Sequence, residues 1–327
     1  MADELRIALL GTKHAHAAGK VEVLEASEDW RLVGAFEPDE AVRREREQQP
    51  IYAGVAWLTK EQILGDASIA AVAVEGEVSG NLALAHEAIH AGKHVHLDKP
   101  PGDDPDAFAV LLEEAGERGL IVQLGYMFRY NPAFQFLFHA QEDGRLGEVF
   151  FARVRMSTSI DAEQRRGLAE YRGGMMFELG CHVLDAVVRL LGVPVAVEGF
   201  LRHDAPAEDA LADNTLAVFS FERAMAVVES AAMEREPFPR RRFEVYGTKG
   251  SIVIEPLEPP AVLACFDSPP QGHAAGWHVV EMPKYVRYVD DFRDLAACIR
   301  AGAPLGYPAE HDIAVQRALL QACRVIS

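Results

Sequence analysis

The sequence predicts an α/β protein of two domains: a doubly wound parallel sheet, then an α/β domain with a large, mostly antiparallel open sheet. The chain has 327 residues, and single hydrophobic cores stop growing near about 250–300 residues. Up to residue 124, short apolar runs alternate with segments of helical periodicity, which indicates a parallel sheet covered on both faces. From residue 125, strand-like runs follow one another through short turns, as in antiparallel sheets. We therefore place the domains at 1–124 and 125–327.

Each predicted element of the first domain follows from its residue pattern. The strands are continuous apolar or β-branched runs bounded by turn residues, and the helices carry apolar side chains at three- and four-residue spacing. The predicted strands are 6–10, 30–36, 70–74, 93–97 and 120–124, and the predicted helices are 17–26, 40–48, 82–91 and 106–118.

The second domain is predicted to begin with a helix over 132–141, a strand over 147–156 and a helix that carries Glu178 and His182 and ends near Gly192. Four alternating runs then predict strands at 195–201, 214–221, 224–232 and 242–246, and a turn at 247–250 leads to a further strand ending at 255. We expect a proline-rich loop over 256–270 and two closing helices over 288–300 and 309–326.

Composition excludes several classes of partner. Asp and Glu number 50 against 32 Lys and Arg, a net charge of −18 that repels phosphate backbones and anionic lipid. We expect no nucleic-acid or membrane partner. Four widely separated cysteines form neither a zinc motif nor a disulfide framework, which suits a reducing cytoplasm: Cys181, Cys265, Cys298 and Cys323. The first apolar run is too short for a signal or membrane segment, so we expect a cytoplasmic protein.

The first predicted strand runs into Gly11-Thr12-Lys13-His14-Ala15-His16, where a dinucleotide fold has its phosphate-binding turn. Only the first glycine of G-x-G-x-x-G is present, and a plain strand-to-helix turn is the alternative. Lys13 and the following helix N-terminus can still meet a pyrophosphate. Glu37 ends the second strand, where a carboxylate bonds ribose hydroxyls and repels a 2′-phosphate. The pattern favours NAD over NADP, although Glu37-Pro38-Asp39 is also a good turn.

Two further motifs carry proton chemistry. Lys99 follows Asp98 at the end of the fourth strand, the edge at which open α/β sheets bind ligands. Glu178, His182 and Asp185 are spaced to share one helix face, for which a solvated polar stripe is the alternative. Hydride transfer from an alcohol needs a base and a group that stabilises oxyanion charge. We assign these roles to His182 and Lys99, with Glu178 orienting one of them or bonding a substrate hydroxyl.

Asp185 is predicted to brace its helix or a neighbouring arginine. Arg129 and Asn131, in Tyr126-Met127-Phe128-Arg129-Tyr130-Asn131-Pro132, are candidate substrate-binding groups. Their alternative is a capped turn with a surface arginine.

These motifs resemble the glucose-fructose oxidoreductase / inositol dehydrogenase / MocA family over nearly the whole chain. The segment from Ala91 to Pro100 is similar to the family's A-G-K-H-V-x-x-E-K-P, with its lysine at Lys99. The run from Gly173 to Asp185 is similar to its glycine-rich lead into D-x-G-x-H-x-x-D. Phe243-Glu244-Val245-Tyr246-Gly247-Thr248-Lys249-Gly250-Ser251 and the tail Asp291-Phe292 with Pro304 also match.

The resemblance implies a Rossmann domain, a C-terminal domain whose open sheet makes an oligomer interface, and a sugar or cyclic polyol substrate. It implies a homodimer or homotetramer. The chain departs from the family at two phosphate-loop glycines, at Asp98 and Glu178, which exchange the usual Glu and Asp, and at Asn81, where a histidine is common. Cofactor contacts are expected from Gly11, Lys13, His14, His16, Glu37, Asp98 and Lys99.

Two alternatives stay open. A sensor of the same fold would bind dinucleotide or sugar without turnover, although it would not need Lys99, Glu178 and His182. Histidines also cluster in the first domain, and His86 and His90 are four apart on a helix. Because no acidic or cysteine ligand lies at a matching spacing, we expect no metal site.

Overall fold

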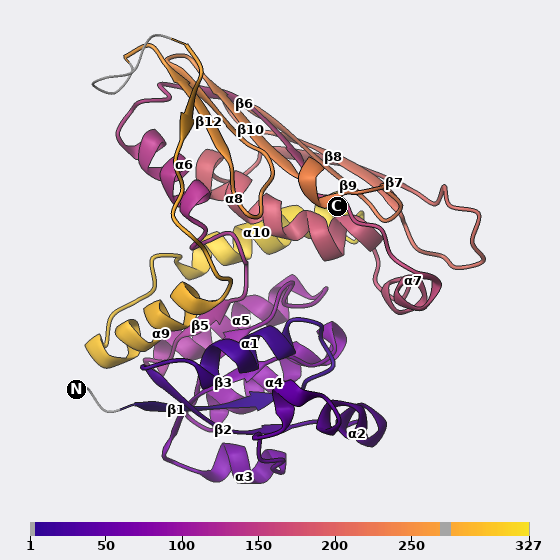
Figure 1. The fold of residues 1–327 in the computed structure, drawn as a ribbon, viewed down its shortest axis with the longest axis vertical. Coiled ribbons are helices and arrows are strands. Elements are labelled where there is room, and N and C mark those ends of the chain that lie inside the picture. The colour runs from indigo at the N-terminus through magenta and orange to yellow at the C-terminus, as the bar shows by residue number, and fades with distance from the viewer. Residues whose placement is uncertain (1–3, 269–275, 327) are drawn as a thin grey trace. The chain divides into compact units, whose positions relative to one another are not determined.

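The computed structural model describes residues 4–268 and 276–326 (Figure 1). Their contacts form two compact units. Unit 1 comprises the chain up to Tyr126 with Val286–Ile313, and unit 2 comprises Met127–Tyr285 with the chain from Ala314 onward. The division differs from the predicted boundary mainly in assigning residues 286–313 to the first unit. The sequence predicts a helix in that segment, but nothing in its pattern indicates that the helix belongs to the first unit.

Unit 1 is built on a parallel sheet in the order β2-β1-β3-β4-β5. The strands are Leu5–Leu10, Trp30–Phe36, Ile69–Val74, His94–Leu97 and Val122–Leu124, numbered β1 to β5 along the chain. The last residues of β1 and β3 are fully buried apolar side chains, as expected for strands covered on both faces. The strand order reverses between β1 and β3, which is where such sheets bind ligands. The prediction of a doubly wound sheet is confirmed.

The helices of unit 1 begin at side-chain caps where the sequence offers them. Asp39 caps α2, Thr59 caps α3 and Asp104 caps α5. The helices are α1 (Ala17–Glu25), α2 (Glu40–Glu47), α3 (Lys60–Gly65), α4 (Val78–His90), α5 (Pro105–Glu117) and α9 (Val289–Ala301). The sequence analysis missed α3, whose six residues are too few to show a helical period.

The helix α9 belongs to unit 1 because its apolar face joins the core of β1, β2 and α1. Phe292, Leu295 and Ala296 pack in one buried cluster with Trp30. The indole of Trp30 also donates a hydrogen bond of 2.7 Å to the carbonyl oxygen of Phe292. This anchoring couples a segment near residue 290 to a strand near residue 30, which no local pattern indicates.

Unit 2 contains an eight-stranded sheet in the order β13-β12-β11-β10-β6-β9-β8-β7, antiparallel except for β6 beside β9. Its strands are β6 (Val149–Arg155), β7 (Ala196–Arg202), β8 (Asn214–Ser220), β9 (Met225–Ala231), β10 (Arg242–Gly247), β11 (Gly250–Ile254), β12 (Val262–Phe266) and β13 (His278–Val280). The helices α6 (Pro132–Glu142) and α8 (Cys181–Leu191) lie along one face of this sheet (Figure 1). The short helix α7 (Ala162–Leu168) was not predicted.

The predicted proline-rich loop over 256–270 is wrong in its central part, because β12 lies there and pairs with β11. The prolines at 256, 259 and 260 precede the strand, and the alternation from Val262 to Phe266 was long enough to form it. The end of that loop, at 269 and 270, lies outside the described residues.

The final helix, α10 (Ala309–Ala322), spans the division between the units. Among the described residues, helices long and apolar enough to cross a membrane are absent.

Candidate active site

The turn after β1 is held tightly at the point where the strand order of unit 1 reverses. Gly11 has φ of +86°, and a Cβ atom there would lie 2.4 Å from the Cα of Gly76, which follows β3. A larger residue is therefore excluded on both conformational and steric grounds. This is the role expected of the first glycine of a phosphate-binding turn.

Glu37 faces this turn from the end of β2. Its Oε2 accepts hydrogen bonds from the backbone N–H (2.7 Å) and the hydroxyl (2.8 Å) of Thr12, and its Oε1 accepts one from the N–H of Asp39 (3.1 Å). A carboxylate offers about four lone-pair positions, so capacity for a ribose hydroxyl is left on Oε1. The arrangement fits a dinucleotide, with Glu37 holding the ribose and the start of α1 facing the diphosphate.

A basic group that the sequence analysis missed also reaches the turn. Arg46 on α2 donates through Nε to the carbonyl oxygen of Thr12 (3.1 Å) and through a terminal nitrogen to that of Lys13 (3.4 Å). Lys13 itself is half-exposed and forms an ion pair with Glu77. Arg46 thus brings a positive charge to the turn that also holds the Glu37 carboxylate, the residue on which the prediction of NAD over NADP rests.

A buried ionic cluster lies beneath the turn. Lys20 on α1 forms ion pairs with Glu75, at the end of β3, and with Asp98, at the end of β4, the latter at 3.0 Å. All three side chains are fully buried. The two histidines of the turn contact the same carboxylate: His14 Nδ1 lies 2.9 Å from Asp98 Oδ2, and His16 Nδ1 lies 3.0 Å from Asp98 Oδ1.

The cluster shifts the ionisation of its members. Burial raises the pKa of Glu75 to about 8 despite the opposing charge of Lys20. Burial lowers the pKa of His16 to about 4, against the pull of Asp98, and Lys99 contributes to the lowering. For Asp98, burial is outweighed by His14, Lys20 and His16, which hold its pKa well below the usual range. At neutral pH the cluster therefore holds an ionised Asp98 beside a neutral His16.

Lys99 is fully buried directly after β4. Asn81, in the first turn of α4, is also fully buried, and its amide nitrogen and oxygen have no hydrogen-bond partner within the described residues. Its Oδ1 lies 3.0 Å from where a Cβ on Gly76 would be. Asn81 therefore presents an unsatisfied amide beside the same turn.

In unit 2, Glu178 and His182 do not lie on one regular α-helix. Residues Met176–Gly180 form a π-helical turn, and α8 begins only at Cys181. The α-helical spacing used to place the two side chains on one face therefore does not apply to Glu178. His182 is buried while Glu178 is half-buried. Single π turns are frequent at functional sites. A Cβ on Gly180 would lie 2.6 Å from the sulfur of Met176, so a larger residue there would have to displace that side chain.

The prediction that Asp185 braces an arginine is confirmed. Arg129 donates to both Asp185 oxygens, through Nε at 3.2 Å and through a terminal nitrogen at 2.7 Å, and both side chains are buried. The alternative of a surface arginine is wrong. Asn131 caps α6 by accepting the N–H of Ala133 at 3.0 Å and is fully buried. Arg129 and Asn131 thus form hydrogen bonds with other residues of unit 2. Their roles in substrate binding stay predictions.

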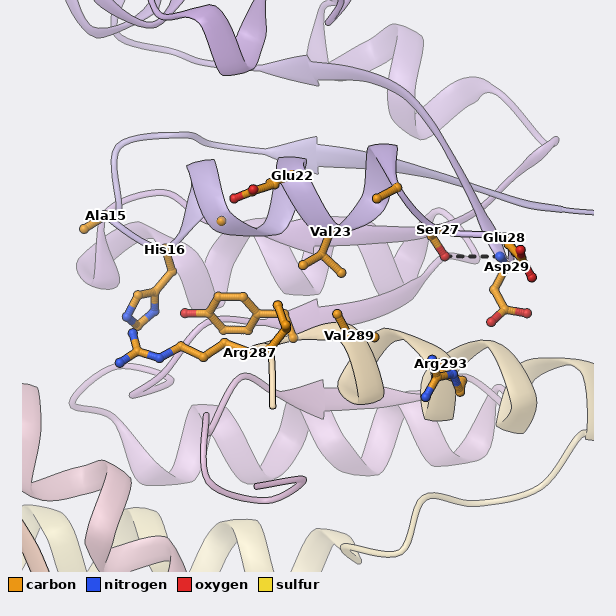
Figure 2. A pocket seen from close by; sticks show the side chains of 14 residues that line it. Ala15, His16, Glu22, Val23, Ser27, Glu28, Asp29, Arg287, Val289 and Arg293 are labelled. Atoms are coloured by element: carbon orange, nitrogen blue, oxygen red, sulfur yellow. Dashed lines mark hydrogen bonds between the residues drawn. The ribbon is translucent and has the colours of Figure 1, made fainter. Parts of the chain in front are cut away.

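A pocket of about 850 Å³ lies beside α1 and the start of α9, away from most of the predicted site residues. Figure 2 shows His16 at one end of it and Ser27 to Asp29 at the other. Tyr288 and Arg287 line it as well. Of the residues predicted for the site, it includes His16.

The structure thus brings His14, His16 and Asp98 together and joins Arg129 to Asp185. Lys99 and His182 belong to different units, so their pairing stays a prediction. The sequence has no acidic ligand at a metal-motif spacing, but the fold places Asp98 against His14 and His16 and places Glu114 of α5 against His86 and His90. Tertiary packing supplies these carboxylates, whereas local spacing was the only criterion applied. A charged residue at the end of the apolar run of β3 was the available signal for Glu75.

Two sequence families match the chain. Residues 5–126 match an oxidoreductase family with an NAD-binding Rossmann fold, and residues 134–253 match the GFO/IDH/MocA C-terminal domain. Together the two matches cover most of the chain.

Individual relatives agree with this assignment. An uncharacterized oxidoreductase, YhhX of Escherichia coli, is 27% identical over 71% of this chain and 65% of its own length. The 1,5-anhydro-D-fructose reductase of Ensifer adhaerens is 26% identical over 61% of each chain. The chain thus spans less than two thirds of the length of these curated relatives. The UDP-N-acetylglucosamine 3-dehydrogenase GnnA of Acidithiobacillus ferrooxidans has the same fold, with a TM-score of 0.81 at 20% identity over 99% of this chain and 98% of that one.

Proposed function

The chain belongs to the GFO/IDH/MocA family of NAD-binding oxidoreductases, and we propose that it transfers a hydride between a nicotinamide cofactor and a secondary alcohol or carbonyl. The proposed substrate is a sugar, a cyclic polyol or a similar polyhydroxylated small molecule. One observation carries the proposal: Lys99 is fully buried directly after β4, at the carboxyl edge of a nucleotide-binding sheet. The curated relative that reduces 1,5-anhydro-D-fructose supports the sugar-like substrate class.

The cofactor would be held by the turn from Gly11 to His16, with Glu37 bonding the ribose. The nicotinamide accepts or supplies the hydride when it is bound. We propose NAD over NADP because the Glu37 carboxylate would repel a 2′-phosphate. Arg46 lies at the same turn and would reduce that discrimination.

The protein's own residues manage the proton and the developing charge. His182 takes the hydroxyl proton as general base, and Lys99 stabilises the oxyanion. Glu178 bonds a substrate hydroxyl or orients His182. The Arg129–Asp185 pair fixes α8 one turn beyond His182, because Asp185 lies three residues along the same helix. Arg129 is thereby a positioning residue for His182. We also propose that Arg129 or Asn131 contacts the substrate directly.

We also propose a homodimer or homotetramer formed through the open face of the unit 2 sheet. Met225 and Leu263 are exposed on strands of that sheet, and apolar sheet faces of this kind commonly mark interfaces. The four cysteines lie within the described residues, and none of them forms a disulfide bond, which supports a reducing compartment such as the cytoplasm.

The test is to screen reduction of NAD⁺ and NADP⁺ against a panel of cyclic polyols and sugars, using wild type, Lys99→Ala and His182→Ala. Each variant is expected to lose about 10²–10⁴ in kcat while NADH still binds in a fluorescence titration. Lys60→Ala and His139→Ala are matched controls, since the first lysine pairs with Glu87 at the surface and the second histidine is exposed on α6.

Near-normal turnover in both site variants would refute the catalytic assignment. A wild-type chain that binds NADH and turns over nothing in the panel would instead favour the sensor, the second candidate that the altered glycine turn permits.

A further inference from the structure

We propose that His14, His16 and Asp98 form a binding site for one divalent first-row transition-metal ion of the Zn²⁺ and Co²⁺ class. The three residues offer two imidazole nitrogens and a carboxylate oxygen, all within 4.8 Å of one another. Two histidines and one carboxylate are a recurrent ligand set for such ions, and they leave further coordination positions open. The proposal goes beyond the dehydrogenase function and does not depend on it.

The ligand atoms lie close enough together to share one ion. Nδ1 of His14 lies 2.9 Å from Asp98 Oδ2, and Nδ1 of His16 lies 3.0 Å from Asp98 Oδ1. Two ligand atoms in a tetrahedral site, each about 2.1 Å from the metal, lie about 3.4 Å apart, so small side-chain rotations would admit an ion. His14 Nδ1 also lies 3.3 Å from the backbone nitrogen of His16. Metal binding would replace the contact between His14 and the carboxylate and would release the proton held between them.

The surroundings of Asp98 resemble the outer shell of a metal site. A ligating carboxylate is usually held by a further hydrogen bond, and Lys20 Nζ contacts Asp98 Oδ1 at 3.0 Å while Oδ2 faces His14. Lys20 also pairs with Glu75.

An ion can reach the site from solvent. The side chains of His14 and His16 are 14% and 16% exposed, whereas Asp98 is fully buried. His16 also lines the pocket beside α1, at the end shown in Figure 2. The open coordination positions would therefore face solvent or a small ligand.

The experiment titrates chelator-treated protein with Co²⁺, followed by visible absorption, and with Zn²⁺, followed by calorimetry, in the absence of nucleotide and substrate. Wild type is expected to bind one ion at this site. His14→Ala, His16→Ala and Asp98→Asn are each expected to weaken binding at least tenfold, with loss of the Co²⁺ absorption band. Circular dichroism checks their folding, and the partly exposed His14 provides a variant that avoids disturbing the buried carboxylate.

The matched control is His86→Ala/His90→Ala. These histidines lie on α4, and both contact Glu114, but they do not meet the three-ligand spacing of the proposed site. The control is expected to keep the tight Co²⁺ site. Absence of Co²⁺ and Zn²⁺ binding in wild type, or loss of binding in the control while His14→Ala and His16→Ala bind normally, would overturn the proposal.

Discussion

The two units bury their site charges in different ways. In unit 1, Lys20 is shared between Glu75 and Asp98, and two histidines join the same carboxylate. In unit 2, the Arg129 guanidinium donates hydrogen bonds to both oxygens of the buried Asp185. In a shared cluster, several side chains compete for the same charged partner, so the cluster can redistribute protons or accept a cation. A single ion pair instead fixes the positions of its two side chains. We therefore expect pH-dependent behaviour from the buried cluster of unit 1 and a positioning role for the Arg129–Asp185 pair of unit 2.

The largest expected effect is the loss of a buried cation. Lys20→Met and Arg129→Met each leave buried carboxylates without their partner, which costs about 3–5 kcal/mol in the free energy of unfolding. Arg44→Met, which removes an exposed pair with Glu40, should cost only about 0.3–0.5 kcal/mol. Denaturant titrations measure all three. Equal small losses at all three positions would remove the distinction between buried and exposed pairs on which the comparison rests.

The second prediction concerns the pH dependence of stability that the buried cluster of unit 1 produces. The pKa of Glu75 rises from 4.5 to about 8 on folding. Between these values the folded chain holds a proton that the unfolded chain has lost, so the free energy of unfolding falls as pH rises across this window. The stabilising contribution is complete below the unfolded pKa and is lost as pH rises through the folded one. Glu75→Gln should therefore flatten the dependence of the unfolding free energy between about pH 5 and pH 8.

Glu77→Gln is the matched control for that experiment, because Glu77 lies two residues further on and is about half exposed. It should retain the wild-type slope. An equally flat slope for both variants, or an unchanged slope for Glu75→Gln, would show that the pH dependence does not arise from the buried cluster.

Sequence reasoning succeeded where structure follows local pattern. The apolar runs of β1 to β4 and the alternation of β7 to β10 predicted the ends of these strands to within about two residues. Burial of one or both faces of a strand requires apolar side chains at regular positions, and that pattern is visible in the sequence. It failed where partners come from distant segments. In the sequence, Lys20 resembles a surface residue of an amphipathic helix, because its partners Glu75 and Asp98 come from distant segments. The π turn before α8 has no periodic sequence pattern that would predict it. Asp185 was predicted correctly in kind, and Arg129, a candidate substrate-binding group with a surface arginine as its alternative, is buried against it.

A third prediction tests cofactor choice at the turn of unit 1. Glu37→Ala should weaken NAD⁺ binding roughly tenfold to a hundredfold, the effect of losing a hydrogen bond to a charged group. It should also improve NADP⁺ binding relative to NAD⁺, because the turn then keeps the positive charge of Arg46 and loses the carboxylate that would repel a 2′-phosphate. Fluorescence titration of both reduced cofactors measures this ratio. Asp39→Asn, which preserves a good N-cap of α2, should leave it unchanged, and tighter binding of NADPH than NADH by wild type would contradict the assignment.

The smallest expected effect compares a cap in each unit. Asn131→Ala removes the cap of α6, and Thr59→Ala removes the cap of α3, each worth about 0.5–2 kcal/mol. The loss should be larger for Asn131, because its side chain is fully buried and also donates to the carbonyl oxygen of Leu257 at 3.4 Å, whereas the Thr59 bonds are exposed. Thermal unfolding measures both. Suppose instead that Asn131→Ala leaves stability unchanged but weakens the affinity for a substrate found by screening. Asn131 would then bind the substrate rather than stabilise the helix, and the positioning role assigned to unit 2 would not include this residue.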